Sequence, residues 1–181
     1  SLGGIIDRID CYDDGKSKYL RVIDYKTGAH KYNVDKLSSG EDLQLPAYLF
    51  TASQDENKNF FGAEKAPRPA SALFLSADEQ KGVITPVRSG FILGNRDILS
   101  AASSGMDKSI LAGITITKKD EISGKAAVSE DDISQMKETM KSTIANPAKN
   151  MYSGKAMRTP SQDACGFCPV RSNCPVAHKE K

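Results

Sequence analysis

Apolar residues typical of strands are interspersed with polar ones in two stretches near the N-terminus, residues 4–12 and 18–27. Runs rich in Ile, Val and Tyr favour β-structure, so both stretches are predicted strands. An Asp14-Gly15 pair stands between them, and Asp-Gly between strand-forming runs is a strong hairpin signal. The pattern therefore predicts an antiparallel hairpin joined by a two-residue turn.

The middle of the chain changes pattern several times. Apolar spacing predicts a helix over residues 41–52, in which Pro46 is tolerable because it falls in the first turn. The other predicted segments are a polar loop over 30–40, a polar irregular stretch over 53–69, strands over 70–77 and 82–88, and a short helix near 96–103 within the Gly- and Ser-rich stretch 90–128.

A longer helix is predicted near the C-terminus. Ser129 precedes three acidic residues, which is the arrangement of a helix N-cap with acids in the first turn. Apolar residues then recur at helical spacing: Ile133, Met136, Met140 and Ile144. We expect this helix to end near residue 146, before Pro147, with its apolar stripe packed against the core.

Strands and helices in this order predict an α/β (mixed α+β) fold, with a central mixed β-sheet flanked by helices. The chain has 181 residues, 39% of them hydrophobic, which is enough for one domain with a real core. We expect residues 1–149 to form that core and residues 150–181 a Cys-rich tail. The chain lacks an initiator Met and runs at once into a predicted strand, so we expect it to be a piece of a longer protein.

The charge of the chain is nearly balanced, with a net charge of +2 at neutral pH. This balance neither demands nor excludes a nucleic-acid partner, and any DNA-binding surface must be a local patch. No apolar run approaches the roughly 20 residues that span a membrane, and the N-terminus lacks the layout of a signal peptide. We therefore expect a soluble, intracellular protein.

Two aspartates and a lysine share one face of the predicted hairpin. Alternation groups Asp24 with Lys26, and the two-residue turn sets Asp7 opposite Val22 on that same face. Neighbouring carboxylates repel unless a cation lies between them, and oxygen ligands suit Mg²⁺ or Mn²⁺. A metal there can activate water, and a lysine can orient the nucleophile or stabilise a charged transition state. A lone Asp-x-Lys pair, however, is equally typical of a solvated strand face.

Other polar groups are predicted to have no catalytic role. Arg8 and Asp10 alternate onto the opposite face of the hairpin, where a structural ion pair is expected. His30 and His178 are expected to be exposed, and neither stands in the spacing of a metal ligand.

The residues around Asp7 and Asp24 resemble those of RecB-family nucleases of the PD-(D/E)XK class. The chain reads Gly-x-x-Asp-Arg-x-Asp from Gly4 onward and Ile-Asp-Tyr-Lys-Thr-Gly around Asp24. In that family the first Asp and the Asp-x-Lys pair form the metal site. The resemblance therefore implies Asp7 and Asp24 as ligands, the Tyr25 carbonyl as a third ligand, and Lys26 as a catalytic residue.

The resemblance continues on the predicted helix over residues 41–52. The family carries a Gln-x-x-x-Tyr motif on the helix after the hairpin, and Gln44 and Tyr48 match it. Helical spacing of four residues puts both side chains on one face. The resemblance implies that they contact a DNA phosphate or support the catalytic lysine.

Three of the four cysteines cluster near the C-terminus as a C-x2-C-x5-C array: Cys165, Cys168 and Cys174. Closely spaced thiolates suit zinc or an iron–sulfur cluster, and three ligands are one short of the usual four. The iron–sulfur members of the RecB-like family end in a similar tail that holds a 4Fe–4S cluster, with the fourth Cys upstream of the nuclease motifs. Cys11 is expected to be a buried small side chain rather than that ligand, so this chain alone is expected to lack an intact cluster.

Taken together, the resemblance implies a PD-(D/E)XK fold and a magnesium-dependent DNA nuclease. The C-terminal helix and tail are most similar to AddB-like subunits of heterodimeric helicase–nucleases, which implies DNA, an AddA-like partner, double-strand-break resection and a bacterial cytoplasmic location. Two alternatives remain: a non-catalytic DNA-binding or scaffold domain with a structural zinc, and a stand-alone CRISPR-type iron–sulfur exonuclease.

Overall fold

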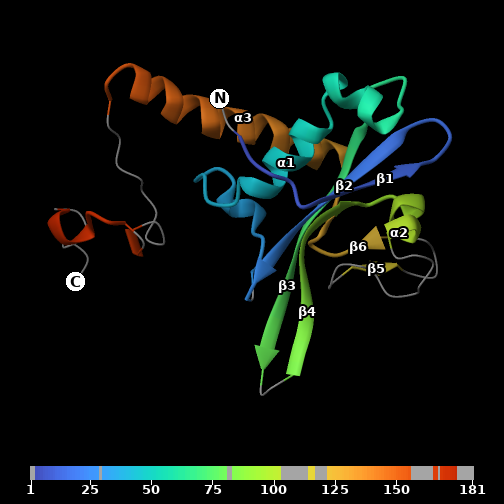
Figure 1. Ribbon diagram of the computed structural model, residues 1–181, viewed down its shortest axis with the longest axis horizontal. Coiled ribbons are helices and arrows are strands. Elements are labelled where there is room, and N and C mark those ends of the chain that lie inside the picture. Colours follow the sequence, from blue (N-terminus) through green and yellow to red (C-terminus); the bar gives the residue numbers. More distant parts are fainter. Residues whose placement is uncertain are drawn as a thin grey trace.

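A five-stranded mixed sheet forms the centre of the molecule, in the order β1-β2-β3-β4-β7 (Figure 1). The computed structural model describes residues 3–28, 30–80, 83–102, 114–116, 122–155, 165–166 and 168–174. The strands are β1 (Arg8–Asp13), β2 (Lys18–Thr27), β3 (Arg68–Gln80), β4 (Val83–Leu93) and β7 (Ala127–Val128), with a separate pair β5 (Thr115–Ile116) and β6 (Ile122–Ser123). The predicted central mixed sheet is confirmed.

Helices lie on both faces of the sheet. They are α1 (Gln44–Ala52), α2 (Arg96–Ala102) and α3 (Glu130–Tyr152), with short 3-10 turns η1 (Val34–Lys36), η2 (Asp55–Phe61) and η3 (Arg171–Asn173). α1 connects β2 to the parallel strand β3 and packs on the face that carries Leu20 and Val22, which are both fully buried. α2 covers the other face, where the Arg21 side chain donates to the Ala102 carbonyl.

The turn of the first hairpin differs from the prediction. Asp13 pairs with Lys18, so four residues form the loop rather than two. The Asp14 carboxylate accepts the N–H groups of Lys16 and Ser17 at 2.7 and 2.6 Å, which stabilises the longer loop. The register therefore moves by two residues, and a shift of two leaves every side chain on its predicted face.

Strands β3 and β4 are both longer than predicted. Gly90 lies opposite Leu73, and a Cβ at Gly90 would meet the Ala72 carbonyl oxygen at 2.1 Å. Only glycine permits this approach of the two strands. Beyond it, Ile92 is buried and pairs with Ala127 of β7, so the strand continues past the end that its sequence pattern suggested.

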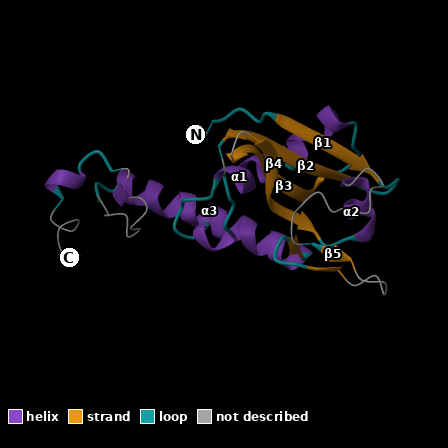
Figure 2. Ribbon diagram, turned by 90° about the horizontal axis from the view of Figure 1, so that it is seen from below, coloured by secondary structure: helices purple, strands orange, loops and turns teal. Residues whose placement is uncertain are grey.

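Helix α3 begins as predicted and ends later than predicted. Ser129 and Asp132 form a reciprocal capping box, and Ile133 and Met136 are buried in the core. The expected end before Pro147 is wrong, because α3 continues to Tyr152. Proline removes one hydrogen bond and crowds the preceding turn, but the residues after it can still donate. The last turns of α3 extend away from the sheet, where Tyr152 is almost fully exposed (Figure 2).

Smaller differences concern the segments on either side of α1. The helix starts at Gln44 rather than near residue 41, because the Asp42 carboxylate accepts the Asn33 N–H and belongs to the preceding loop. The irregular stretch predicted over 53–69 contains η2, and the predicted polar loop over 30–40 contains η1.

None of the described helices is both long enough and apolar enough to cross a membrane.

Candidate active site

Asp24 stands at the centre of the site. It lies on β2 next to Phe74 of β3, and it is only 3% exposed although it is a carboxylate. The Lys26 ammonium lies 2.8 Å from its Oδ2 atom, and the Gln44 amide donates to its Oδ1 atom at 2.9 Å. Burial of a charge is costly unless it is paired, and these two neighbours supply the compensation.

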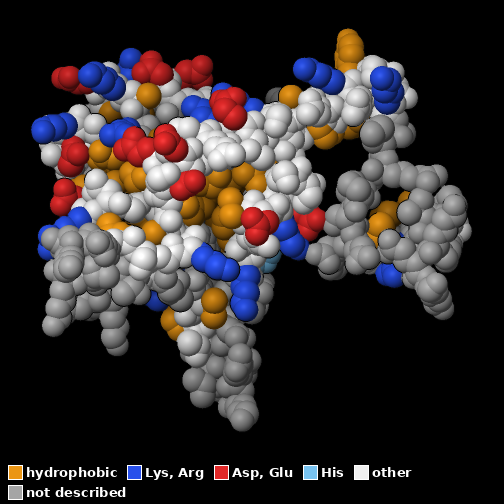
Figure 3. All heavy atoms as spheres, turned by 180° about the vertical axis from the view of Figure 1, so that it is seen from behind, with side chains coloured by type: hydrophobic (Ala, Val, Ile, Leu, Met, Phe, Trp, Pro, Cys, Tyr) orange, Lys and Arg blue, Asp and Glu red, His pale blue; other side chains and the backbone are white. Residues whose placement is uncertain are grey.

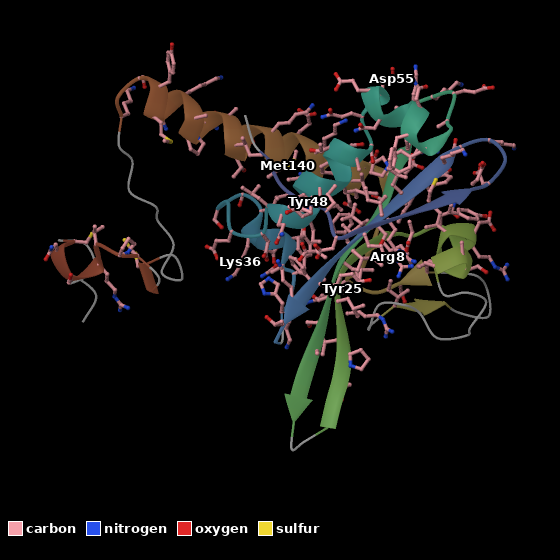
Figure 4. All side chains as sticks on the ribbon, viewed as in Figure 1. Arg8, Tyr25, Lys36, Tyr48, Asp55 and Met140 are labelled. Atoms are coloured by element: carbon pink, nitrogen blue, oxygen red, sulfur yellow. The ribbon has the colours of Figure 1, made fainter. Side chains whose placement is uncertain are left out.

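Gln44 joins the two charged groups. Its Oε1 atom accepts from the Lys26 ammonium at 2.8 Å, while its Nε2 atom donates to Asp24 and lies 3.2 Å from the Tyr48 hydroxyl oxygen. Tyr48 lies on α1, one turn after Gln44, and the contact between them puts both side chains on one face of the helix (Figure 4 labels Tyr48). The side chains predicted from the strand and the helix therefore form one hydrogen-bonded network.

Asp7 lies immediately beside this network. β1 begins at Arg8, which pairs with Ile23, so Asp7 precedes the strand at the end where Asp24 follows Ile23. The Asp7 Oδ2 atom accepts the Tyr25 backbone N–H at 2.8 Å, which ties the side chain to β2. The Asp7 carboxylate thus lies next to the backbone of Tyr25, the residue after Asp24, whereas Val22, its predicted partner, pairs with Ile9.

The residues present fit a divalent cation. Oδ2 of Asp24 is fully buried and receives no hydrogen bond, because Lys26 is close but out of hydrogen-bond geometry. Within the described ranges no group of three or more His, Cys, Asp or Glu side chains could hold a metal, and Asp7 and Asp24 are the two carboxylates that the sequence predicts as donors. An all-oxygen set with few protein ligands suits Mg²⁺, which keeps several of its waters.

The opposite face of the hairpin holds an ion-pair network, as expected. Arg8 donates to Asp10 at 2.8 Å, and Arg21 forms a second pair with the same carboxylate. Partial burial raises the pKa of Asp10, but hydrogen bonds from both arginines outweigh it, so the net pKa lies below its ordinary value. The part of Arg21 in this ion-pair network was not predicted from the sequence. Arg21 stands two residues after Tyr19 on the same strand, so alternation puts both on one face, and that position could have indicated it.

Residues 1–175 match the family model of the PD-(D/E)XK nuclease superfamily. The chain belongs to this superfamily. It is also similar to bacterial proteins whose name describes one subunit of an ATP-dependent helicase/deoxyribonuclease. It is 26% identical to those of Thermoanaerobacter sp. strain X514 and Clostridioides difficile over 96% of its length, and 47% identical to that of Carboxydothermus hydrogenoformans over 39%.

The chain spans only 17% of the Thermoanaerobacter and Clostridioides relatives and 6% of the Carboxydothermus one. The predicted PD-(D/E)XK fold and the resemblance to AddB-like subunits are confirmed by these matches. The role of each side chain in the site remains a prediction.

Gly4 has a role that the sequence pattern did not reveal. A Cβ at this position would lie 2.8 Å from a ring carbon of Tyr48, so the segment before β1 passes close over the phenol ring. The glycine at the start of the nuclease motif thus permits contact between the N-terminal segment and α1.

The cysteines are arranged differently from the expectation in one respect. Cys11 is exposed, not buried, because β1 is the edge strand of the sheet. Cys165 and Cys168 are joined by a 3.4 Å backbone hydrogen bond, and Cys174 follows η3. In the described part of the chain these three thiols do not converge as a metal site, so the iron–sulfur cluster stays a prediction.

One of the two histidines, His30, lies among the described residues. His30 is exposed, as expected, and its ring contacts the edge of Phe74 at 4.4 Å between centroids. His178 lies outside the described residues.

Proposed function

We propose that this domain is a magnesium-dependent deoxyribonuclease that hydrolyses DNA phosphodiester bonds. The observation that carries the proposal is the linked set Asp24, Lys26 and Gln44 beside Asp7, on the fold of a nuclease superfamily. The relatives' name includes deoxyribonuclease, which supports DNA as the substrate.

The metal would be held by Asp7 and Asp24, with the Tyr25 carbonyl as a further ligand. When bound, it would supply a Lewis acid that lowers the pKa of a water and neutralises charge on the phosphate. The protein's own contribution is orientation, since Gln44 holds the Asp24 carboxylate and the Lys26 ammonium in one fixed arrangement.

Lys26 would act on the substrate. Its side chain is 28% exposed, and its ammonium lies 5.2 Å from the centroid of the Phe74 ring, a cation–π contact that supports the extended side chain. From there it can donate to a phosphate oxygen or hold the attacking water. Either contact stabilises negative charge that grows as the phosphodiester reacts.

The wider biological role is proposed from the relatives. A helicase–nuclease subunit would work with an AddA-like partner at DNA ends during double-strand-break resection, in the bacterial cytoplasm. Cys165, Cys168 and Cys174 would complete a 4Fe–4S cluster in the longer protein, together with a cysteine outside this chain. The relatives' printed name, which gives an ATP-dependent helicase and a subunit, supports the assembly.

The test is cleavage of end-labelled single- and double-stranded DNA by the 181-residue chain with Mg²⁺, compared with its Lys26→Ala variant. We expect the variant to cut on the order of 100-fold more slowly while it binds DNA normally, because the ammonium acts on developing charge. Lys58→Ala is the matched control, since Lys58 pairs with Asp55 at the surface of η2. Near-normal cutting by Lys26→Ala, or no cutting by the unmodified chain in Mg²⁺ or Mn²⁺, would contradict the proposal.

A further inference from the structure

A groove of about 700 Å³ lies between the segment 31–35, the open part of β4, and the turn before β7. Among the described residues that line it, three are cationic and come from these separate parts of the chain, Lys31, Arg88 and Lys125, and one is a carboxylate, Asp35. These lining residues therefore carry a positive balance of charge, although the whole chain carries a net charge of only +2.

The groove is built on anchored backbone. The Tyr32 N–H donates to the Ser89 hydroxyl at 2.8 Å, which holds the segment after β2 onto β4. The Tyr32 ring packs 5.6 Å from Phe91, and its hydroxyl reaches the Met136 sulfur of α3. Lys31 is thus carried by a segment that the sheet and α3 fix in place.

The groove opens next to the active site. Phe74 connects the two: the Lys26 ammonium lies 5.2 Å from its ring, and the His30 ring lies 4.4 Å from it on the way to Lys31. Ser89, which lines the groove, is the β4 partner of Phe74 in the sheet. The groove and the active site therefore occupy neighbouring positions of the sheet, since Asp24, Phe74 and Ser89 are successive partners across β2, β3 and β4.

The charges of the groove are available for a ligand. Within the described ranges Lys31, Arg88 and Lys125 form no ion pair, whereas nearby Lys36 pairs with Glu41. Seen from behind, lysine and arginine side chains gather beside the histidine (Figure 3). The aromatic rings in the lining, Tyr32 and Phe91, pack against each other and offer no platform for a base. The groove therefore suits a polyanionic backbone rather than bases.

We propose that this groove, with Lys31, Arg88 and Lys125, holds the phosphodiester backbone of the DNA strand next to the bond that is cut. The inference rests on the proposed nuclease function and adds to it a sequence-independent binding site. His30, between the groove and Lys26, would face the phosphate that joins the two sites.

The test is the salt dependence of DNA binding by the 181-residue chain, measured with a labelled single-stranded oligonucleotide in Ca²⁺ so that cleavage does not interfere. Each lost phosphate contact should reduce the slope of log K against log salt concentration by about 0.7. The triple variant Lys31→Ala, Arg88→Ala, Lys125→Ala should therefore lose about 1.4 to 2.1 from that slope.

The matched control removes the same charge elsewhere, as Lys16→Ala, Lys65→Ala, Lys137→Ala, three exposed lysines outside the groove. It should leave the slope unchanged. An unchanged slope in the groove variant, an equal loss of slope in the control, or a chain that binds no DNA would overturn the inference.

Failure of the proposed function gives a different result: Lys26→Ala would keep cutting DNA whatever the groove variant did. Circular dichroism shows whether each variant is folded. If the triple variant is unfolded, the three single variants replace it, and each is expected to reduce the slope by about 0.7.

Discussion

The Gln44 amide donates to the Asp24 carboxylate at 2.9 Å and accepts from the Lys26 ammonium at 2.8 Å, so one side chain of α1 orients both charged groups of β2. Because the helix connects β2 to β3, this contact also joins two layers of the fold. We accordingly propose Gln44 as a positioning residue, whose loss should be visible in catalysis rather than in folding alone.

Gln44→Leu should lower the rate of DNA cleavage by about 10- to 100-fold, as for other residues that orient metal-site groups. The apparent affinity for Mg²⁺, measured by titrating the cleavage rate, should fall with it, because Asp24 loses its hydrogen bond. Gln44→Glu tests charge separately: a carboxylate can accept from Lys26 but repels Asp24. A Gln44→Leu variant with unchanged rate and unchanged Mg²⁺ dependence would remove Gln44 from the site.

Gly90→Ala should destabilise the fold by about 1–3 kcal/mol, since the new methyl group would collide with backbone of β3. Gly94→Ala is the control, because its nearest neighbour would be 3.5 Å away, an ordinary contact. Urea unfolding of both variants measures the difference. Equal stability of the two would show that β3 and β4 can separate at Gly90 without cost.

The Asp10 pair predicts a pH dependence of stability. The folded pKa of Asp10 is lowered below the ordinary value of 3.8, since the hydrogen bonds from Arg8 and Arg21 outweigh burial. Because the folded pKa is lowered, the ionised carboxylate of Asp10 stabilises the fold fully at pH values above its unfolded pKa. That stabilisation is lost as the pH falls through its folded pKa. The free-energy difference of unfolding between the unmodified chain and Asp10→Asn should therefore be constant near neutral pH and shrink below about pH 4. A difference independent of pH down to about 3 would mean that the ion pairs do not stabilise the fold.

The cysteine tail predicts that this chain alone, purified aerobically, holds no stoichiometric 4Fe–4S cluster. Three cysteines in the tail leave a four-thiolate cluster one ligand short. Iron and acid-labile sulfide assays measure this directly. A full complement of iron that is lost in Cys11→Ser would contradict the prediction and make the exposed Cys11 the fourth ligand.

The face that carries the candidate catalytic residues could be predicted from sequence because it depends only on a period of two. The hairpin register was wrong by two residues, yet Asp24 and Lys26 still share a face, and Asp7 still bonds to the backbone of β2 next to them. Gln44 and Tyr48 were equally predictable, because a helix repeats every 3.6 residues and four positions bring them together.

The remaining features depend on contacts between distant parts of the chain. The loop at Asp14 is decided by a side chain that bonds to backbone, and the exposure of Cys11 by the position of β1 at the sheet edge. The groove joins Lys31 to Lys125, which only the folded sheet brings together. No local pattern contains that information.

Anomalous diffraction from crystals soaked in Mn²⁺ tests the central claim most directly, namely that Asp7 and Asp24 hold a divalent cation beside Lys26. We predict an anomalous peak between the two carboxylates that is lost in Asp24→Asn, because that oxygen pair is the charged donor set of the site. A map with no peak between Asp7 and Asp24, from crystals in which the hairpin is ordered as described, would contradict the account.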